Sequence, residues 1–167
     1  RGPSKTMALS SNPPPDPTWP ASCVELLQST VRFDSVNAAI SGRANPEAPL
    51  AAFIEALARS RGLTTRRLPI SSDRATGAPE PVEASSALDA LDHHDDHDDD
   101  ATGAFNLLIE DQIAGDRPWL LFESHLDTVS VAGMTIDPFA AELQDGRIWG
   151  RGSTDTKGTG AAMLWAL

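Results

Sequence analysis

Residues 123–129 read Glu-Ser-His-Leu-Asp-Thr-Val, and this stretch decides how the rest of the chain is interpreted. In it, His125 precedes Asp127 by two residues, directly after the apolar run 118–122. The spacing alone is uninformative, because each of the four histidines has an aspartate two residues later. His125 differs from the others in its context. A short apolar run bounded by turn residues is typical of a buried strand, and His125 would lie at the end of that strand.

A metal site is one interpretation of this strand end. On a strand, residues two positions apart project from the same face, so Asp127 can hydrogen-bond the imidazole nitrogen that a metal leaves free. In open α/β sheets, sites collect at the carboxyl ends of strands. A second carboxylate, Asp155, lies in a glycine-rich loop before a predicted helix, where small residues permit a close approach. The residues alone also allow a hydrogen-bonded structural histidine and a helix-capping aspartate.

Other chemistry fits these motifs poorly. Lys157 has neither the glycine before it nor the serine or threonine after it that a Walker A loop requires, and the dinucleotide glycine pattern also fails. Ser124 would point to the opposite face of a strand from His125, and the G-x-S-x-G elbow is absent. The sequence therefore argues against nucleotide binding and a serine nucleophile.

The acidity of the chain is concentrated in one segment. The formal net charge is −11, but residues 71–103 hold ten acidic residues and one basic residue. We predict that this segment is a disordered insertion, with adventitious metal binding by the His/Asp run 92–100 as the alternative. Because phosphate contacts need the opposite charge, no nucleic-acid partner is expected.

The predicted location is the cytoplasm, without a membrane partner. Apolar runs fall short of the roughly 18 residues of a membrane span. The single cysteine, Cys23, has no internal disulfide partner, which fits a reducing compartment. The proline-rich residues 1–17 are expected to form a disordered lead, and the chain starts without methionine and stops within an apolar run, as a fragment would.

The periodicity predicts an α/β domain over residues 18–167, with a mixed sheet covered by helices. The first helix is expected over 20–33, with a capping box of Ser22 and Glu25 and an apolar stripe of Val24, Leu27 and Val31. In the second helix, Asn45 is the expected cap and Gly62 the terminator. The remaining expected elements are strands at 63–70, 105–111 and 118–125, a hairpin over 139–149 turning at 145–146, and a helix from 157.

Several linked motifs resemble one known family: the zinc aminoacylases, acetylornithine deacetylases, succinyl-diaminopimelate desuccinylases and related carboxypeptidases and dipeptidases. The motifs are HLDTV at 125–129, DPF at 137–139, DGRIWGRGSTDTKG at 145–158 and AAML at 161–164. Weaker similarity covers 24–37 and 50–63, which look like the two opening helices of the family.

The resemblance implies a site built on three of these residues. His125 would ligate one metal ion, Asp127 would orient that histidine as part of the catalytic machinery, and Asp155 would bridge two zinc ions, with cobalt or manganese as possible substitutes. It further implies a cis peptide bond between Asp155 and Thr156. The implied reaction of the parent protein is cleavage of an amide bond in an N-acyl amino acid or short peptide, and a homodimer is compatible with the family.

The sequence departs from the family pattern at two places. Met134 and Ile136 occupy the interval in which the family often has a tryptophan. The family's glutamate base and its later metal ligands would follow Leu167, so we expect the chain alone to be an inactive N-terminal portion of the catalytic domain that binds zinc weakly. A non-enzymatic metal-binding module built on residues 92–100, or a remnant, is the competing interpretation.

Overall fold

The computed structural model describes residues 18–70, 103–111 and 120–167. The expectations for residues 1–17 and for nearly all of 71–103 therefore lie outside the described residues. The described elements, in chain order, are α1 (Cys23–Val31), α2 (Ala38–Ser41), α3 (Ala48–Ser60), β1 (Thr64–Pro69), β2 (Phe105–Glu110), β3 (Glu142–Gln144), β4 (Arg147–Trp149) and α5 (Lys157–Ala166).

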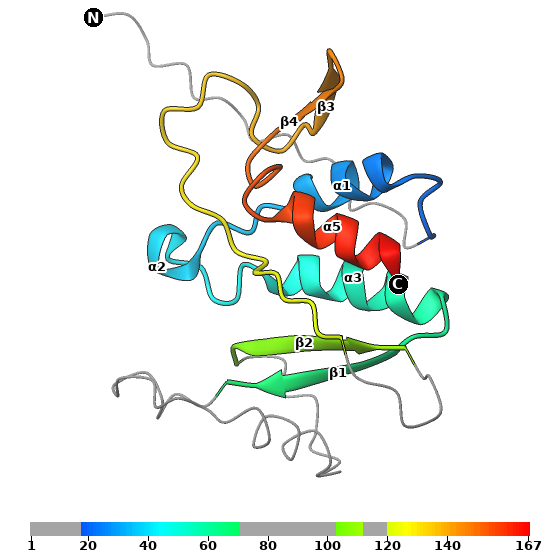
Figure 1. The fold of residues 1–167 in the computed structure, drawn as a ribbon. Helices are drawn as coiled ribbons and strands as arrows, with labels where there is room; N and C mark the ends of the chain where they lie inside the picture. Colours follow the sequence, from blue (N-terminus) through cyan, green and yellow to red (C-terminus); the bar gives the residue numbers. More distant parts are fainter. Residues whose placement is uncertain (1–17, 71–102, 112–119) are drawn as a thin grey trace, which may run out of the picture.

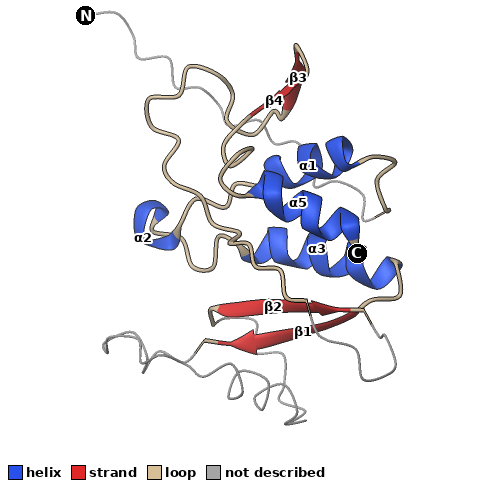
Figure 2. Ribbon diagram, in the orientation of Figure 1, coloured by secondary structure: helices blue, strands red, loops and turns tan. Residues whose placement is uncertain are grey.

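Three helices form the centre of the structure. Helix α5 lies between α1 and α3, the β1–β2 pair lies along the other side of α3, and the β3–β4 hairpin extends away from the helices (Figure 1). Long loops connect these elements, among them the described residues 120–141 before β3 (Figure 2). Helices and small sheets of this kind agree with the predicted partial α/β domain.

Helix α1 begins as predicted, and Leu27 and Val31 of the predicted stripe face the core, but Val24 does not. Ser22 is the N-cap, and its hydroxyl accepts a hydrogen bond from the backbone nitrogen of Glu25 at 3.2 Å. Leu26 and Val31 are fully buried, whereas the side chain of Val24 is 43% exposed. Helical spacing alone does not decide which of two neighbouring faces of α1 is buried. Contact with α3 and α5 buries the face that carries Leu26.

Helix α3 begins later than its sequence signals suggested. Glu47 occupies the cap position without a side-chain hydrogen bond. Asn45, the expected cap, has a φ of 43° and accepts a turn hydrogen bond from Ala48 N through its backbone carbonyl. The predicted terminator is confirmed, since Gly62 adopts a φ of 78° directly after the helix.

The strands pair locally. β1 and β2 are antiparallel, from Thr64 opposite Glu110 to Pro69 opposite Phe105, and β3 and β4 form the expected hairpin. The parallel pairing that a mixed sheet requires is limited, within the described residues, to one bridge between Val36 and Thr128.

The predicted buried strand over 118–125 is wrong for its described part. Residues 120–127 form no strand, and Leu120 and Leu121 are 77% and 79% exposed. A strand requires a neighbour for its backbone groups, and the bridge at Thr128 supplies one only beyond His125.

The hydrophobic core joins all three long helices. Its buried members are Leu26, Leu50, Phe53, Leu57, Ala161 and Leu164. At the edge of this core the rings of Trp19 and Trp165 stack with their centroids 5.8 Å apart, and the guanidinium of Arg61 lies 4.2 Å from the Trp19 ring centroid. The N-terminal segment is thereby held against the last helix. Within the described ranges, none of the helices has the length and apolar character needed to cross a membrane.

Candidate functional site

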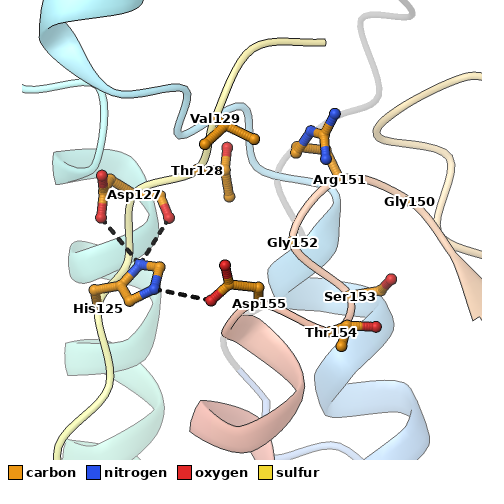
Figure 3. Close-up of a pocket in the computed structure, with 10 residues that line it drawn as sticks. All are labelled: His125, Asp127, Thr128, Val129, Gly150, Arg151, Gly152, Ser153, Thr154 and Asp155. Carbon is orange, nitrogen blue, oxygen red and sulfur yellow. Dashed lines mark hydrogen bonds and ion pairs between the residues drawn. The ribbon is translucent and has the colours of Figure 1, made fainter. Parts of the chain in front are cut away.

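An open pocket of about 240 Å³ lies where two loops meet. One loop carries the HLDTV motif and the other leads from β4 into α5. The lining residues are His125, Asp127, Thr128, Val129, Gly150, Arg151, Gly152, Ser153, Thr154 and Asp155 (Figure 3). Two of the four sequence motifs that carried the family resemblance therefore line one cavity.

His125 lies between the two predicted carboxylates. Its Nδ1 is 3.0 Å from both the backbone carbonyl oxygen and the Oδ1 of Asp127. Its Nε2 is 3.1 Å from Oδ1 of Asp155. Figure 3 shows the ring directed at Asp127 on one side and at Asp155 on the other. The three predicted site residues thus lie together, with Asp127 at one ring nitrogen of His125 and Asp155 at the other.

The neighbouring carboxylates change the proton affinity of the ring. Burial lowers the pKa of His125, but the hydrogen bonds to Asp155 and to the Asp127 backbone, with the charges of both carboxylates, outweigh it and raise that pKa. A cation that took the place between Nε2 and Asp155 would meet the same two negative charges. The site therefore favours positive charge, whether from a proton or from a metal ion.

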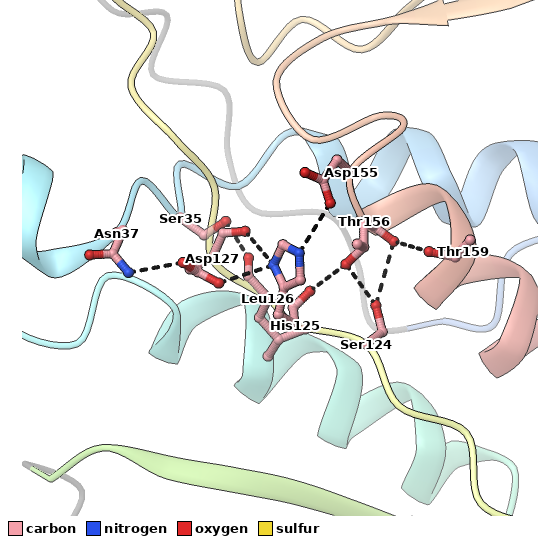
Figure 4. A network of polar contacts seen from close by, with 9 residues as sticks. All are labelled: Ser35, Asn37, Ser124, His125, Leu126, Asp127, Asp155, Thr156 and Thr159. Carbon is pink, nitrogen blue, oxygen red and sulfur yellow. Dashed lines mark hydrogen bonds and ion pairs between the residues drawn. The ribbon is translucent and has the colours of Figure 1, made fainter. Parts of the chain in front are cut away.

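Hydroxyl groups connect the HLDTV loop to the start of α5. The Oγ of Ser124 lies 2.9 Å from Oγ1 of Thr156, which also donates to the carbonyl of His125 at 2.9 Å. Thr159 donates in turn to the carbonyl of Thr156 (Figure 4). The peptide bond between Asp155 and Thr156 is cis, as the resemblance implied. Ser124 therefore contributes to this connection through Thr156.

Helix α5 is also attached to the end of α1 by a buried lysine. Lys157 is 3% exposed and donates from Nζ to the carbonyl of Phe33 at 2.8 Å. Burial lowers its pKa to about 8, against the attraction of Asp34, which raises it. This contact, in the DTKG part of the motif, fixes where α5 begins.

The pocket wall opposite α5 is held by an arginine. Arg151 donates from its backbone nitrogen to the Pro138 carbonyl at 2.7 Å and from Nη2 to the Ser130 carbonyl at 2.7 Å. Both ends of the loop 130–138, which contains the departure from the family pattern at Met134, are therefore attached to the glycine-rich loop.

Sequence reasoning missed the residues that support Asp127 from the N-terminal half. Nδ2 of Asn37 donates to Asp127 Oδ2 at 2.9 Å, and Ser35 Oγ donates to the Leu126 carbonyl at 2.7 Å (Figure 4). These pairs are separated by about ninety residues, so no local pattern marks them. The SVN triplet at 35–37 was visible only as part of the weaker resemblance.

The donor set fits a zinc ion in part. An imidazole nitrogen and a carboxylate oxygen are ordinary zinc ligands, and here they face each other beside an open pocket. No group of three or more histidine, cysteine, aspartate or glutamate side chains suited to a metal occurs in the described part of the chain. Two donors are thus provided, fewer than the three or four protein ligands of typical zinc sites.

The comparisons with known proteins match the part of the chain that carries this site. Residues 121–167 match Peptidase family M20/M25/M40. The resemblance to this family, predicted from the motifs, is therefore confirmed for that segment. No solved structure gives a significant match.

Curated relatives agree with the family match. Succinyl-diaminopimelate desuccinylase of Beijerinckia indica is 50% identical over 52 residues, which cover 29% of this chain and 14% of the relative. The enzymes of the same name from Wolinella succinogenes and Aliarcobacter butzleri are 41% and 40% identical over 66 and 68 residues, which cover 39% and 40% of this chain. These two matches cover 18% and 19% of the relatives, so the chain spans under a fifth of their length.

Proposed function

We propose that the chain is part of a zinc-dependent amidohydrolase that cleaves an N-acyl amino acid, of the deacetylase or desuccinylase type, or a short peptide. The observation that carries the proposal is the position of His125, with Nε2 facing Asp155 at 3.1 Å and Nδ1 held by Asp127 at 3.0 Å. The family segment and the desuccinylase relatives support the same class of reaction.

Each of the three residues has a distinct role in this proposal. His125 and Asp155 would hold the zinc through Nε2 and a carboxylate oxygen, and the Asp155 carboxylate would also suit a second ion. Asp127 keeps the proton of His125 on Nδ1, which leaves the lone pair of Nε2 for the metal. Zinc supplies the Lewis acidity that makes an amide carbonyl susceptible to water.

The proposal is tested by zinc binding to the purified 167-residue chain, measured by competition with a chromophoric chelator. We expect weak binding that His125→Ala and Asp155→Ala each reduce by at least about 10-fold, since loss of even an outer partner of a metal ligand has an effect of that size. The same preparation is expected to show no amide hydrolysis, because Asp127 engages the far nitrogen of His125 and the described residues add no third metal ligand to the His125–Asp155 pair.

The acidic run provides the matched control. Replacing the three histidines of residues 92–100 with alanine should leave the His125-dependent zinc binding intact. If this triple variant instead loses all zinc binding while His125→Ala retains it, the non-enzymatic metal-binding module replaces the proposed enzyme.

A further inference from the structure

The segment 35–37, between α1 and α2, lies against the HLDTV loop and holds it by backbone contacts. Thr128 N donates to the Ser35 carbonyl at 2.9 Å, and Asn37 N donates to the Thr128 carbonyl at 2.8 Å. Ser35 is fully buried and also holds the Leu126 carbonyl. The backbone on both sides of Asp127 is therefore fixed by this segment, whatever the Asn37 side chain does.

The side chain of Asn37 makes two further contacts of different kinds. Its Oδ1 accepts a hydrogen bond from Ala39 N at 2.9 Å and so caps the short helix α2. Its Nδ2 donates to Asp127 Oδ2 at 2.9 Å, while Oδ1 of Asp127 is 3.0 Å from Nδ1 of His125 (Figure 4). The Asp127 carboxylate thus has one oxygen engaged by Asn37 and the other by His125.

We propose that Asn37 is a positioning residue for the metal ligand His125, acting through Asp127. The inference rests on the proposed function of His125 and adds a residue that lies outside the four linked motifs, in the stretch of weaker similarity. With Oδ2 held, the carboxylate cannot rotate away, so Oδ1 stays in the place that accepts the Nδ1 proton. An amide suits this task because it is neutral: an arginine or lysine would bind the carboxylate as an ion pair and compete with the histidine for its charge.

Substitutions at Asn37 can remove its contact with Asp127 while they keep its capping contact with α2. Asn37→Ser and Asn37→Asp both retain an oxygen that caps a helix well, and both remove the Nδ2 donor. Asn106→Ala, at an exposed position of β2, is the matched control for loss of an asparagine amide. A role confined to capping α2 predicts that the serine variant resembles the wild-type chain, whereas the aspartate variant also places a second negative charge against Asp127 Oδ2.

The first readout is the tautomer of His125 in the metal-free 167-residue chain, from long-range ¹H–¹⁵N correlations at a pH where the ring is neutral. The His125 signals are assigned by their loss in His125→Ala. We expect the wild-type chain and Asn106→Ala to carry the proton on Nδ1, and both Asn37 variants to show an increased Nε2-protonated fraction. In the second readout, zinc affinity falls by about 10-fold in both Asn37 variants, the lower end of the range for outer partners of metal ligands.

Two different failures are distinguishable. If both Asn37 variants show the wild-type tautomer and zinc affinity, the positioning role is overturned while the proposed function stands. If zinc binds the wild-type chain and His125→Ala equally, the proposed function is overturned, and the tautomer of the Asn37 variants still decides whether Asn37 orients the ring. A thermal unfolding midpoint measured for each variant separates both outcomes from simple loss of the fold.

Discussion

At the scale of single residues, Glu55 on α3 is a buried charge outside the pocket with two arginine partners. Its side chain is 10% exposed, and it accepts from Arg59 Nη2 at 2.6 Å and from Arg67 Nη2 at 2.7 Å. Arg67 belongs to β1, and its guanidinium also lies 4.8 Å from the ring centroid of Phe105 on β2. One carboxylate therefore links the helix to the sheet beside it.

Replacing Glu55 with alanine should lower the free energy of unfolding by about 2 kcal/mol, since hydrogen bonds to charged groups contribute roughly 1.5–3 kcal/mol each and the arginines remain partly hydrated. Chemical denaturation measures the loss. Glu110→Ala is the matched control, because Glu110 meets Arg66 at a longer 3.3 Å and its side chain is 21% exposed. We expect at most about 1 kcal/mol there. An equal loss in the two variants would contradict a special role for Glu55.

The site residues show what a sequence can predict at this scale. His125, Asp127 and Asp155 were found because their motifs are local and their spacing is that of a known family. Asn37 was not, because its contact with Asp127 depends on how the loop after α1 meets the HLDTV loop. Val24 was assigned to the buried face because spacing along one helix does not say which neighbours the helix has.

At the scale of elements, the start of α5 is packed closely against the loop before it and against Ser124. A Cβ on Gly158 would collide with the backbone carbonyl oxygen of Ser153. A Cβ on Gly160 would lie 2.9 Å from the Oγ of Ser124. The two glycines let the helix begin directly after Asp155 and against the loop that carries His125.

Gly158→Ala is therefore expected to reduce the free energy of unfolding by about 1–3 kcal/mol through overpacking. The sign is informative, because the same change in an unobstructed helix stabilises it by up to about 1 kcal/mol. Thermal or chemical unfolding provides the measurement. Gly103→Ala, where a Cβ would meet nothing within 4 Å, should change stability by no more than about 0.5 kcal/mol. A more stable Gly158→Ala protein would show that the collision is relieved without loss.

Element prediction succeeded where the determining contacts are local. The hairpin turn at Asp145 and Gly146, with φ values of 52° and 73°, and the cap of α1 are set within four residues. The strand expected over 118–125 failed because its apolar composition describes a preference for burial, while a strand forms only with a neighbouring backbone. The described chain supplies that neighbour only at Thr128.

At the scale of the whole molecule, the segment after residue 119 leaves apolar surface uncovered. Leu120, Leu121 and Phe122 are 77%, 79% and 44% exposed, and Val129 is 61% exposed at the far end of the same segment. Contiguous exposed apolar surface promotes association between molecules. The chain therefore combines a packed three-helix core with an exposed apolar segment, 120–129, that would favour association.

Leu121→Ser should reduce concentration-dependent association, measured by sedimentation velocity or light scattering, while the free energy of unfolding changes by no more than about 0.5 kcal/mol. Leu57→Ala, at a fully buried position, should instead lose about 2–5 kcal/mol without a direct effect on association of the folded chain. If Leu121→Ser leaves the association unchanged, the molecules associate through another surface.

The stacked pair of Trp19 and Trp165 has an optical consequence. Two indoles this close couple their electronic transitions, so the pair contributes a paired positive and negative band to the circular dichroism spectrum that neither ring gives alone. The guanidinium over Trp19 also places a positive charge beside one chromophore and shifts its emission. Separation of the first described segment from α5 would extinguish that signal while leaving the helical spectrum in place. The two tryptophans thus report, without an added label, whether the first and last described segments of the sequence remain in contact.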